Sequence, residues 1–185
     1  MQLQRYVFWR NLQTGGSEYC SLFQVAQGWM LKGTAISLTN ERVPILAEYE
    51  IVTDESWQTR SVAIRTLCGA DSKTLRLIAE LPGHWQAHGK SVPQFNGCID
   101  VDLGISPSTN TLPIRRLNLA IGQPEDVVAA WVRFPDLSLE PLPQRYTRLS
   151  DDRYKYESGS GFQTEMTVDE SGLVIVYEKG WERVA

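Results

Sequence analysis

Two carboxylates separated by a single residue are the strongest chemical signal in the chain. Asp100 and Asp102 lie in the string Gly-Cys-Ile-Asp-Val-Asp-Leu, and side chains two apart on a strand point to the same side. Such a pair can act as acid and base, bind a cation, or accept hydrogen bonds from sugar hydroxyls. Alternatively, one aspartate anchors an arginine in an ion pair beneath the surface and ties down a long loop.

More polar side chains follow these aspartates at short range. Asn110 comes first, and Arg115 and Arg116 come next, between Pro113 and Leu117. If this segment is extended, Arg115 and Arg116 face opposite sides, so only one of them can point toward a given site. The stretch 111–121 fits a helix or a strand equally well. We expect Asn110 and both arginines to be candidates for ligand binding.

A second polar cluster surrounds a tryptophan at residues 54–60. If the run is a strand, Trp57 shares a face with Thr59 and Ser61, and Arg60 lies on the other. A tryptophan ring beside hydrogen-bonding groups suits the apolar face and polar rim of a sugar. The alternative, which composition alone favours, is that the aromatic residues only pack the core. Trp57 and Arg60 complete the set of candidate ligand-binding residues.

The sequence lacks the motifs that mark several common enzyme and nucleotide-binding sites. The chain has no GxSxG elbow, no GxxxxGK[ST] loop and no GxGxxG fingerprint. The two histidines, His84 and His88, lie between glycines in an expected turn without a nearby acidic or thiol ligand, and the three cysteines form no CxxC motif. We therefore predict no metal, no cofactor, no disulfide framework and no catalytic residue. The formal net charge of −4, without a Lys/Arg run, argues against nucleic-acid binding.

Turn signals recur about every 8–12 residues, the spacing of an all-β domain. Between them lie short runs rich in β-branched and aromatic residues. Leu75, Leu77, Ala79 and Leu81 alternate with polar residues, and the runs 162–168 and 173–177 flank a four-residue connection typical of a hairpin. These patterns predict a mainly β, single-domain antiparallel meander over residues 1–185.

Helix and membrane signals are weak. Pro124-Glu125-Asp126 resembles a helix N-terminus, but residues 131–134 read as a strand, so any helix there is short. No apolar run approaches the ~20 residues of a membrane span. The stretch 1–12 has no continuous apolar core and no small-residue cleavage site, so it does not resemble a secretory signal. A cytoplasmic location is the expectation.

Several strings, in order, resemble a known bacterial family. The central one runs from Gly97 to Leu103 and continues through Pro107 to Leu117. The others are Gly16 to Cys20, Trp57 to Arg60, Trp131 to Pro135, Gln144 to Tyr146, Val168 to Val174, and Trp181. On these residues the chain is similar to the family described as putative glycolipid-binding. The resemblance implies an antiparallel sheet curled into a half-open barrel with little helix, like the half-barrels of bacterial lipoprotein carriers. It also implies a groove for a lipid or glycolipid.

Three functions follow as competing hypotheses. The first is non-catalytic binding of an amphiphilic ligand in the groove of the half-barrel, with an acyl chain contributing about 0.8 kcal/mol per buried CH₂. The second is a protein-interaction module with no small ligand, acting through an open face or edge of the sheet. The third is a hydrolase acting on a lipid or sugar with Asp100 and Asp102, or Asp54 and Glu55, as acid and base. An unclosed sheet often pairs its edge, so a homodimer is a further expectation.

Overall fold

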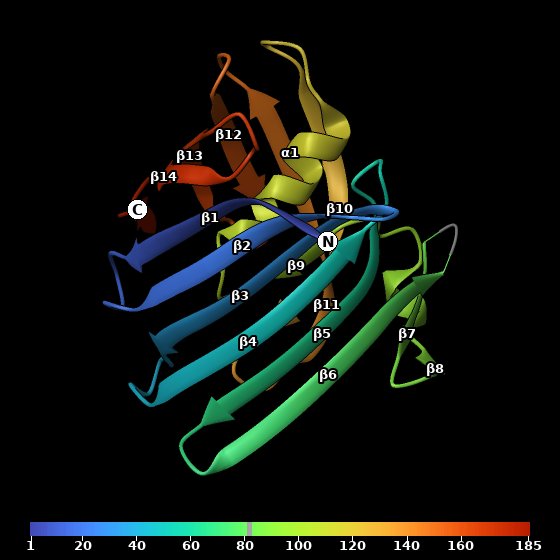
Figure 1. Cartoon of the computed structure of the whole chain (residues 1–185), viewed down its shortest axis with the longest axis vertical. Helices are drawn as coiled ribbons and strands as arrows, with labels where there is room; N and C mark the ends of the chain where they lie inside the picture. The colour runs from blue at the N-terminus through green and yellow to red at the C-terminus, as the bar shows by residue number, and fades with distance from the viewer. Residues whose placement is uncertain (81–82) are drawn as a thin grey trace.

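The computed structural model describes residues 1–80 and 83–185, and these form one continuous sheet (Figure 1). In its first part lie β1 (Gln2–Asn11), β2 (Ser17–Val25), β3 (Gly28–Leu38), β4 (Pro44–Thr53), β5 (Thr59–Cys68), β6 (Asp71–Glu80), β7 (His84–Ala87) and β8 (Lys90–Ser91). A middle segment holds η1 (Pro93–Phe95), β9 (Val101–Leu103), η2 (Ser108–Asn110) and α1 (Thr111–Leu117). The last part holds β10 (Pro124–Arg133), β11 (Ser138–Arg148), β12 (Arg153–Ser158), β13 (Gln163–Val168), β14 (Val174–Tyr177) and β15 (Trp181–Arg183).

The strands pair mostly with their sequence neighbours, as a meander requires. The sheet has 15 strands in the order β8 to β1, then β15 to β9. The first and last strands therefore pair with each other and join the two halves of the chain, while β8 and β9 lie at opposite edges and leave the barrel unclosed. The predicted half-open antiparallel fold is confirmed. One pair that the sequence did not predict is parallel, β9 with β10.

Period-two alternation decides which face of each strand is buried. In β6, Leu75, Leu77 and Ala79 are buried while the residues between them are exposed, as predicted. Leu81, the fourth residue of that pattern, lies outside the described residues. The predicted hairpin is also confirmed, because β13 pairs with β14 and Val168 lies opposite Val174.

One local expectation was wrong, and the structure decides two that the sequence left open. Residues 124–133 form β10 with no helix, because each of them pairs with β11. Trp57 is not on a strand: it has a φ of 65° in the turn before β5, so it does not continue the face of Ser61. The ambiguous stretch 111–121 contains α1, which ends where Asn118 adopts a left-handed conformation. The cysteines are free, and Cys68 is only partly buried.

The middle segment fills the inside of the curled sheet. Figure 1 shows α1 above the ribbon of β1, beside the C-terminal strands, and β9 behind the ribbons of β2 and β3. Phe95, Leu103 and Leu112 of this segment are fully buried in the same core cluster as Trp9 of β1 and Met166 of β13. The protein's own side chains therefore occupy most of the concave interior. Open space for a ligand remains at the ends and on the outside of the sheet.

Candidate functional site

A pocket of about 280 Å³ opens where β9 and η2 meet the ends of β12, β14 and β15. We call it the Asp102 pocket, and its polar lining is Asn11, Gln13, Asp102, Ser106, Asn110, Ser158 and Ser160. Its aromatic lining is Trp131, Tyr156, Phe162, Tyr177 and Trp181. At the low end of the usual volume range for ligand sites, it suits a head group or a single sugar ring better than a whole lipid.

Asp102 supplies the negative charge of this pocket. It is the central residue of β9 and lies beside Trp131 of the parallel strand β10. Its Oδ2 accepts a hydrogen bond of 2.5 Å from Nε2 of Gln144. Burial raises the pKa of the Asp102 carboxyl to about 6, and the hydrogen bond from Gln144 only partly opposes this. Asp102 is therefore mostly ionised at neutral pH and remains an acceptor.

Asn110 lies in η2 and is held in place by the residues around it. Its Nδ2 donates to the backbone oxygen of Pro107 at 3.0 Å, and its Oδ1 accepts from the hydroxyl of Tyr146 at 2.9 Å. The amide is thus fixed in orientation beside the pocket. The structure brings together two of the predicted ligand-binding residues, Asp102 and Asn110.

Three aromatic rings form one wall of the pocket. Phe162 and Tyr177 stack with centroids 6.0 Å apart and planes 7° apart. Tyr156 lies 6.2 Å from Phe162 and 6.4 Å from Tyr177 between ring centroids. Burial and the nearby Asp102 charge raise the pKa of the Tyr156 and Tyr177 hydroxyls, so both stay protonated as hydrogen-bond donors. Sequence reasoning missed this wall because Tyr177 of β14 is distant in sequence from Tyr156 and Phe162 of the β12–β13 hairpin.

Asp100 has a different role from Asp102. Its two carboxylate oxygens accept hydrogen bonds from Arg116, with Nε to Oδ1 at 3.0 Å and a terminal nitrogen to Oδ2 at 2.6 Å. The Asp100 side chain is 2% exposed and that of Arg116 is 15% exposed. Burial raises the pKa of Asp100, and the bidentate arginine opposes that rise. The pair ties α1 to the start of β9, which matches the ion-pair alternative.

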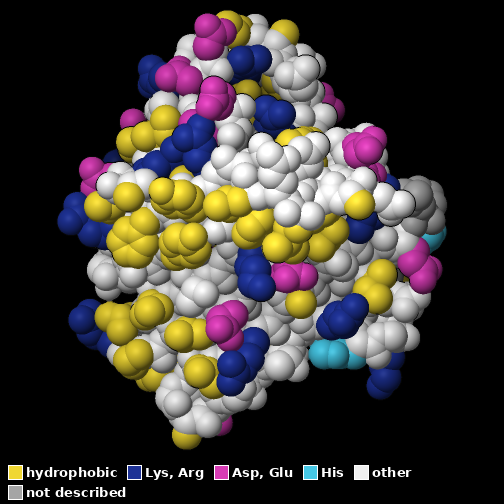
Figure 2. Space-filling view, in the orientation of Figure 1, with side chains coloured by type: hydrophobic (Ala, Val, Ile, Leu, Met, Phe, Trp, Pro, Cys, Tyr) yellow, Lys and Arg dark blue, Asp and Glu magenta, His cyan; other side chains and the backbone are white. Residues whose placement is uncertain are grey.

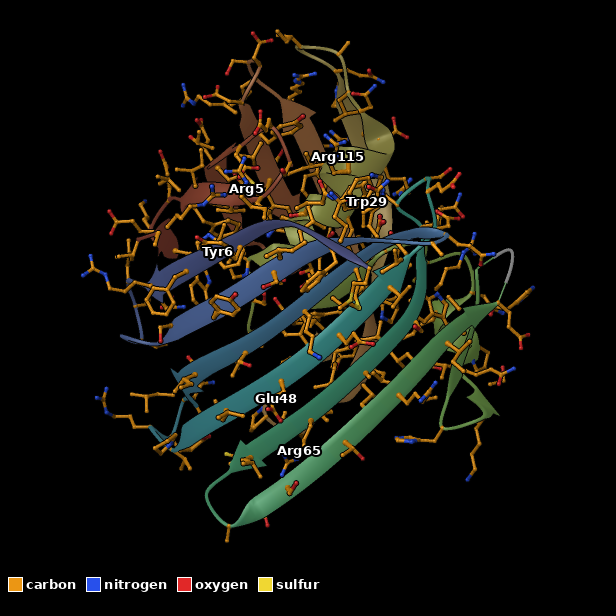
Figure 3. All side chains as sticks on the ribbon, viewed as in Figure 1. Arg5, Tyr6, Trp29, Glu48, Arg65 and Arg115 are labelled. Carbon is orange, nitrogen blue, oxygen red and sulfur yellow. The ribbon has the colours of Figure 1, made fainter. Side chains whose placement is uncertain are left out.

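The remaining predicted site residues lie on α1, at the start of β5 and in the turn before it. Trp57 stacks on Trp29 with centroids 4.9 Å apart, and the guanidinium carbon of Arg115 lies 5.3 Å from the Trp57 ring centroid. Figure 3 shows Trp29 of β3 and Arg115 of α1 close together. Arg115 also donates to the backbone oxygen of Glu170 at 3.0 Å, and Arg60 pairs with Asp54. Trp57, Arg60, Arg115 and Arg116 do not line the Asp102 pocket.

A buried glutamate on β2 supports the loop that carries the pocket. Oε1 of Glu18 accepts hydrogen bonds from the Tyr49 hydroxyl at 2.5 Å and from Oγ of Ser106 at 2.7 Å. Tyr49 also lies 2.7 Å from Oγ of Ser108, so this cluster fastens residues 106–108 to the N-terminal strands. Oε2 of Glu18 is buried without a partner. Burial raises the pKa of Glu18 to about 7, against the effect of the two hydrogen bonds.

Gly33 makes room for this cluster. It lies opposite Tyr49 on the neighbouring strand, and a Cβ at Gly33 would come within 2.4 Å of the tyrosine ring. We expect Gly33→Ala to destabilise the protein by about 1–3 kcal/mol, because the buried ring must move away from Glu18. Urea unfolding measures this. In a Tyr49→Ala background the same substitution should cost almost nothing, and an undiminished cost there would contradict the role assigned to Gly33.

The outer face of β1 to β6 carries a second hollow. It encloses about 1010 Å³ and includes Tyr19, Phe23, Met30, Glu48 and Arg65. Figure 2 shows hydrophobic side chains gathered in two bands across this face, with charged side chains between them. Figure 3 labels Tyr6 on β1, Glu48 on β4 and Arg65 on β5. A terminal nitrogen of Arg65 lies 3.2 Å from a carboxylate oxygen of Glu48. Unlike the Asp102 pocket, this surface is broad and open, and it carries two ion pairs, Lys32 with Glu50 and Arg65 with Glu48.

Within residues 1–80 and 83–185, no group of three or more His, Cys, Asp or Glu side chains has an arrangement that could hold a metal ion. The helices of this part of the chain are too short to cross a membrane.

Comparisons with known proteins agree with the fold. A sequence model of the family described as "Putative glycolipid-binding" matches residues 6–183. The crystal structure of a DUF1089 family protein from Pseudomonas aeruginosa is similar, with 33% sequence identity, a TM-score of 0.83 and 95% of each chain covered. No curated protein matches the sequence.

Proposed function

We propose, from the premise that this chain belongs to the putative glycolipid-binding family, that its Asp102 pocket binds the polar head group of an amphiphilic ligand. The observation that carries the proposal is the convergence of Asp102 and Asn110 with the ring wall of Tyr156, Phe162 and Tyr177. Acceptors and donors beside aromatic faces are what a polyhydroxylated head group needs. Phe162, which is 41% exposed, offers apolar surface beside the pocket for the start of an acyl chain.

The proposed role is binding without chemical turnover. The hydrolase hypothesis pairs Asp100 with Asp102, and the two-carboxylate mechanism of glycosidases needs both carboxyl groups to reach the same substrate. The carboxylate of Asp100 is occupied by Arg116, which leaves Asp102 as the single carboxylate in the pocket. Passive capture needs no second group. We keep a cytoplasmic location as a prediction.

The ligand site is narrower than the groove expected from the sequence. The middle segment fills the concave interior, so the proposal places the ligand at the pocket near one end of the half-barrel. Trp57, Arg60, Arg115 and Arg116 then support the fold around α1, and only Asp102 and Asn110 of the predicted set would touch the ligand.

Native mass spectrometry of protein purified without detergent from the organism that encodes it tests the proposal. We expect a discrete mass excess that resolves into one lipid class after solvent extraction, and we expect Asp102→Asn to lower its occupancy at least several-fold. Asp126→Asn is the matched control, because Asp126 is an exposed surface residue of β10 paired with Arg145. An apo mass for the wild type, or equal occupancy in Asp102→Asn, would count against the head-group site.

A second candidate function is supported by the outer face. Tyr6 is 60% exposed, Tyr19 49% and Ile36 50%, and such an apolar surface on β1 to β3 can dock another protein. Two results together would favour this function over the first. The wild type would retain no lipid, and it would form a homodimer or a stoichiometric complex with a partner that Tyr6→Ser and Tyr19→Ser abolish.

A further inference from the structure

The Asp102 pocket lacks a positive charge of its own. Among the described residues that line it there is one carboxylate and no lysine, arginine or histidine. Three other aspartates differ, because Asp100 pairs with Arg116, Asp126 with Arg145 and Asp169 with Arg183. Within the described part of the chain, Asp102 forms no ion pair and has only the neutral amide of Gln144. Removing an ionised carboxylate from water without a counter-charge is costly, so a cation in the pocket would be favoured.

The aromatic wall favours the same kind of ligand. Aromatic faces carry negative potential and attract cations within about 6 Å of the ring centroid. Arginines fill this role at two other rings: Arg115 lies over Trp57, and Arg133 lies over Trp131, which also lines the pocket. In residues 1–80 and 83–185 no such contact involves Tyr156, Phe162, Tyr177 or Trp181. These rings and the Asp102 carboxylate surround the same space.

We infer that the head group bound in the Asp102 pocket carries a protonated or quaternary amine, as an amino sugar or a choline-type head group does. This inference rests on the proposed function and names its ligand class. A phosphate or an acidic sugar would meet Asp102 with a like charge, and a neutral sugar could donate hydrogen bonds to the carboxylate but would leave it without a counter-charge. The pocket volume of 280 Å³ equals that of about nine waters at ~30 Å³ each, which is enough for one substituted ring or one trimethylammonium group.

The inference also sets the direction of the pH dependence. The pKa of Asp102 is about 6 in the unliganded pocket, so the carboxyl gains a proton and loses its charge as the pH falls through 6. Binding of a cationic group should therefore be strongest above pH 7 and weaken toward pH 5. Binding of a neutral sugar should change little over the same range.

The test is a calorimetric or NMR titration with two pairs of probes that differ in charge. Glucosamine is compared with glucose, and choline with its neutral carbon isostere 3,3-dimethylbutan-1-ol. At pH 7.5 we expect at least one amine to bind roughly ten-fold more tightly than its neutral counterpart, a difference of about 1.4 kcal/mol. Asp102→Asn should abolish that preference, Asp126→Asn should keep it, and the thermal unfolding of both variants shows whether they fold.

Each outcome has a distinct meaning. A preference for glucosamine alone identifies an amino sugar, and a preference for choline alone identifies a choline-type group. Equal binding of the amine and its neutral counterpart in both pairs would overturn the inference while leaving the head-group pocket in place. The absence of binding by both amines at millimolar concentrations would also overturn it. Lipid retained in the native mass experiment would still support the proposed function in that case.

Discussion

Arg116→Met is expected to destabilise the protein by about 3–5 kcal/mol. The substitution keeps most of the apolar length of the side chain but removes both hydrogen bonds to the 2%-exposed carboxylate of Asp100. That carboxylate is then left buried without a partner, or must take up a proton. The loss should also loosen α1 from the start of β9, because this ion pair joins the two elements.

The chain contains a matched control for this experiment. Arg145 holds Asp126 in the same bidentate arrangement, at 2.7 Å and 2.6 Å, on the exposed face of β10 and β11. Because solvent screens that pair, Arg145→Met should cost far less stability than Arg116→Met. Asp100→Asn added to Arg116→Met should recover part of the loss by removing the buried charge. Urea denaturation measures all four proteins, and equal costs for the two arginine substitutions would contradict the structural role of Asp100 and Arg116.

Glu18 is expected to make stability fall as the pH rises toward 8. The pKa of a glutamate carboxyl is ordinarily near 4.5, and burial raises that of Glu18 to about 7. The folded protein therefore binds a proton that the unfolded chain has already released between these two values. The contribution of Glu18 to stability is fully present below pH 4.5 and is lost as the pH rises through 7. The full change amounts to roughly 3 kcal/mol.

Glu18→Gln isolates this contribution, because glutamine cannot ionise. We expect the difference in unfolding free energy between Glu18→Gln and the wild type to move in favour of the variant by roughly 3 kcal/mol from pH 4.5 to pH 8. The unpaired Oε2 position leaves the new amide without an acceptor, which adds a cost that does not depend on pH. Glu48→Gln, the same change on the outer face, provides the comparison. A pH-independent difference for Glu18→Gln would show that Glu18 does not titrate in this range.

Much of the fold could be predicted from local patterns. Alternation in Leu75, Leu77 and Ala79 fixed the buried face of β6, and the connection before Leu173 marked the β13–β14 hairpin. Such signals lie within a few residues of each other. The parallel pairing of β9 with β10 and the pairing of β1 with β15 depend on contacts between distant segments, which no local pattern contains.

The short segment 100–117 shows the limit for the site. Asp100 and Asp102 are indistinguishable in the sequence, yet one is held by Arg116 of α1 and the other faces a pocket. The difference arises because residues 111–117 form a helix, which a single sequence left ambiguous, and because the aromatic wall comes from β12, β14 and the residues before β13. Glu18 was missed for a similar reason. A glutamate on an alternating strand is expected to face solvent, but here Tyr49 and Ser106, distant in sequence, surround it.

The most direct measurement is a crystal structure of the protein purified from its own organism without detergent, with whatever ligand it retains. We expect density for a head group inside the Asp102 pocket, with a polar atom within hydrogen-bonding distance of the Asp102 carboxylate and the rest of the ligand leaving past Phe162. A ligand bound instead on the outer face of β1 to β6, or a lipid-loaded protein with the Asp102 pocket filled only by solvent, would contradict the proposed site.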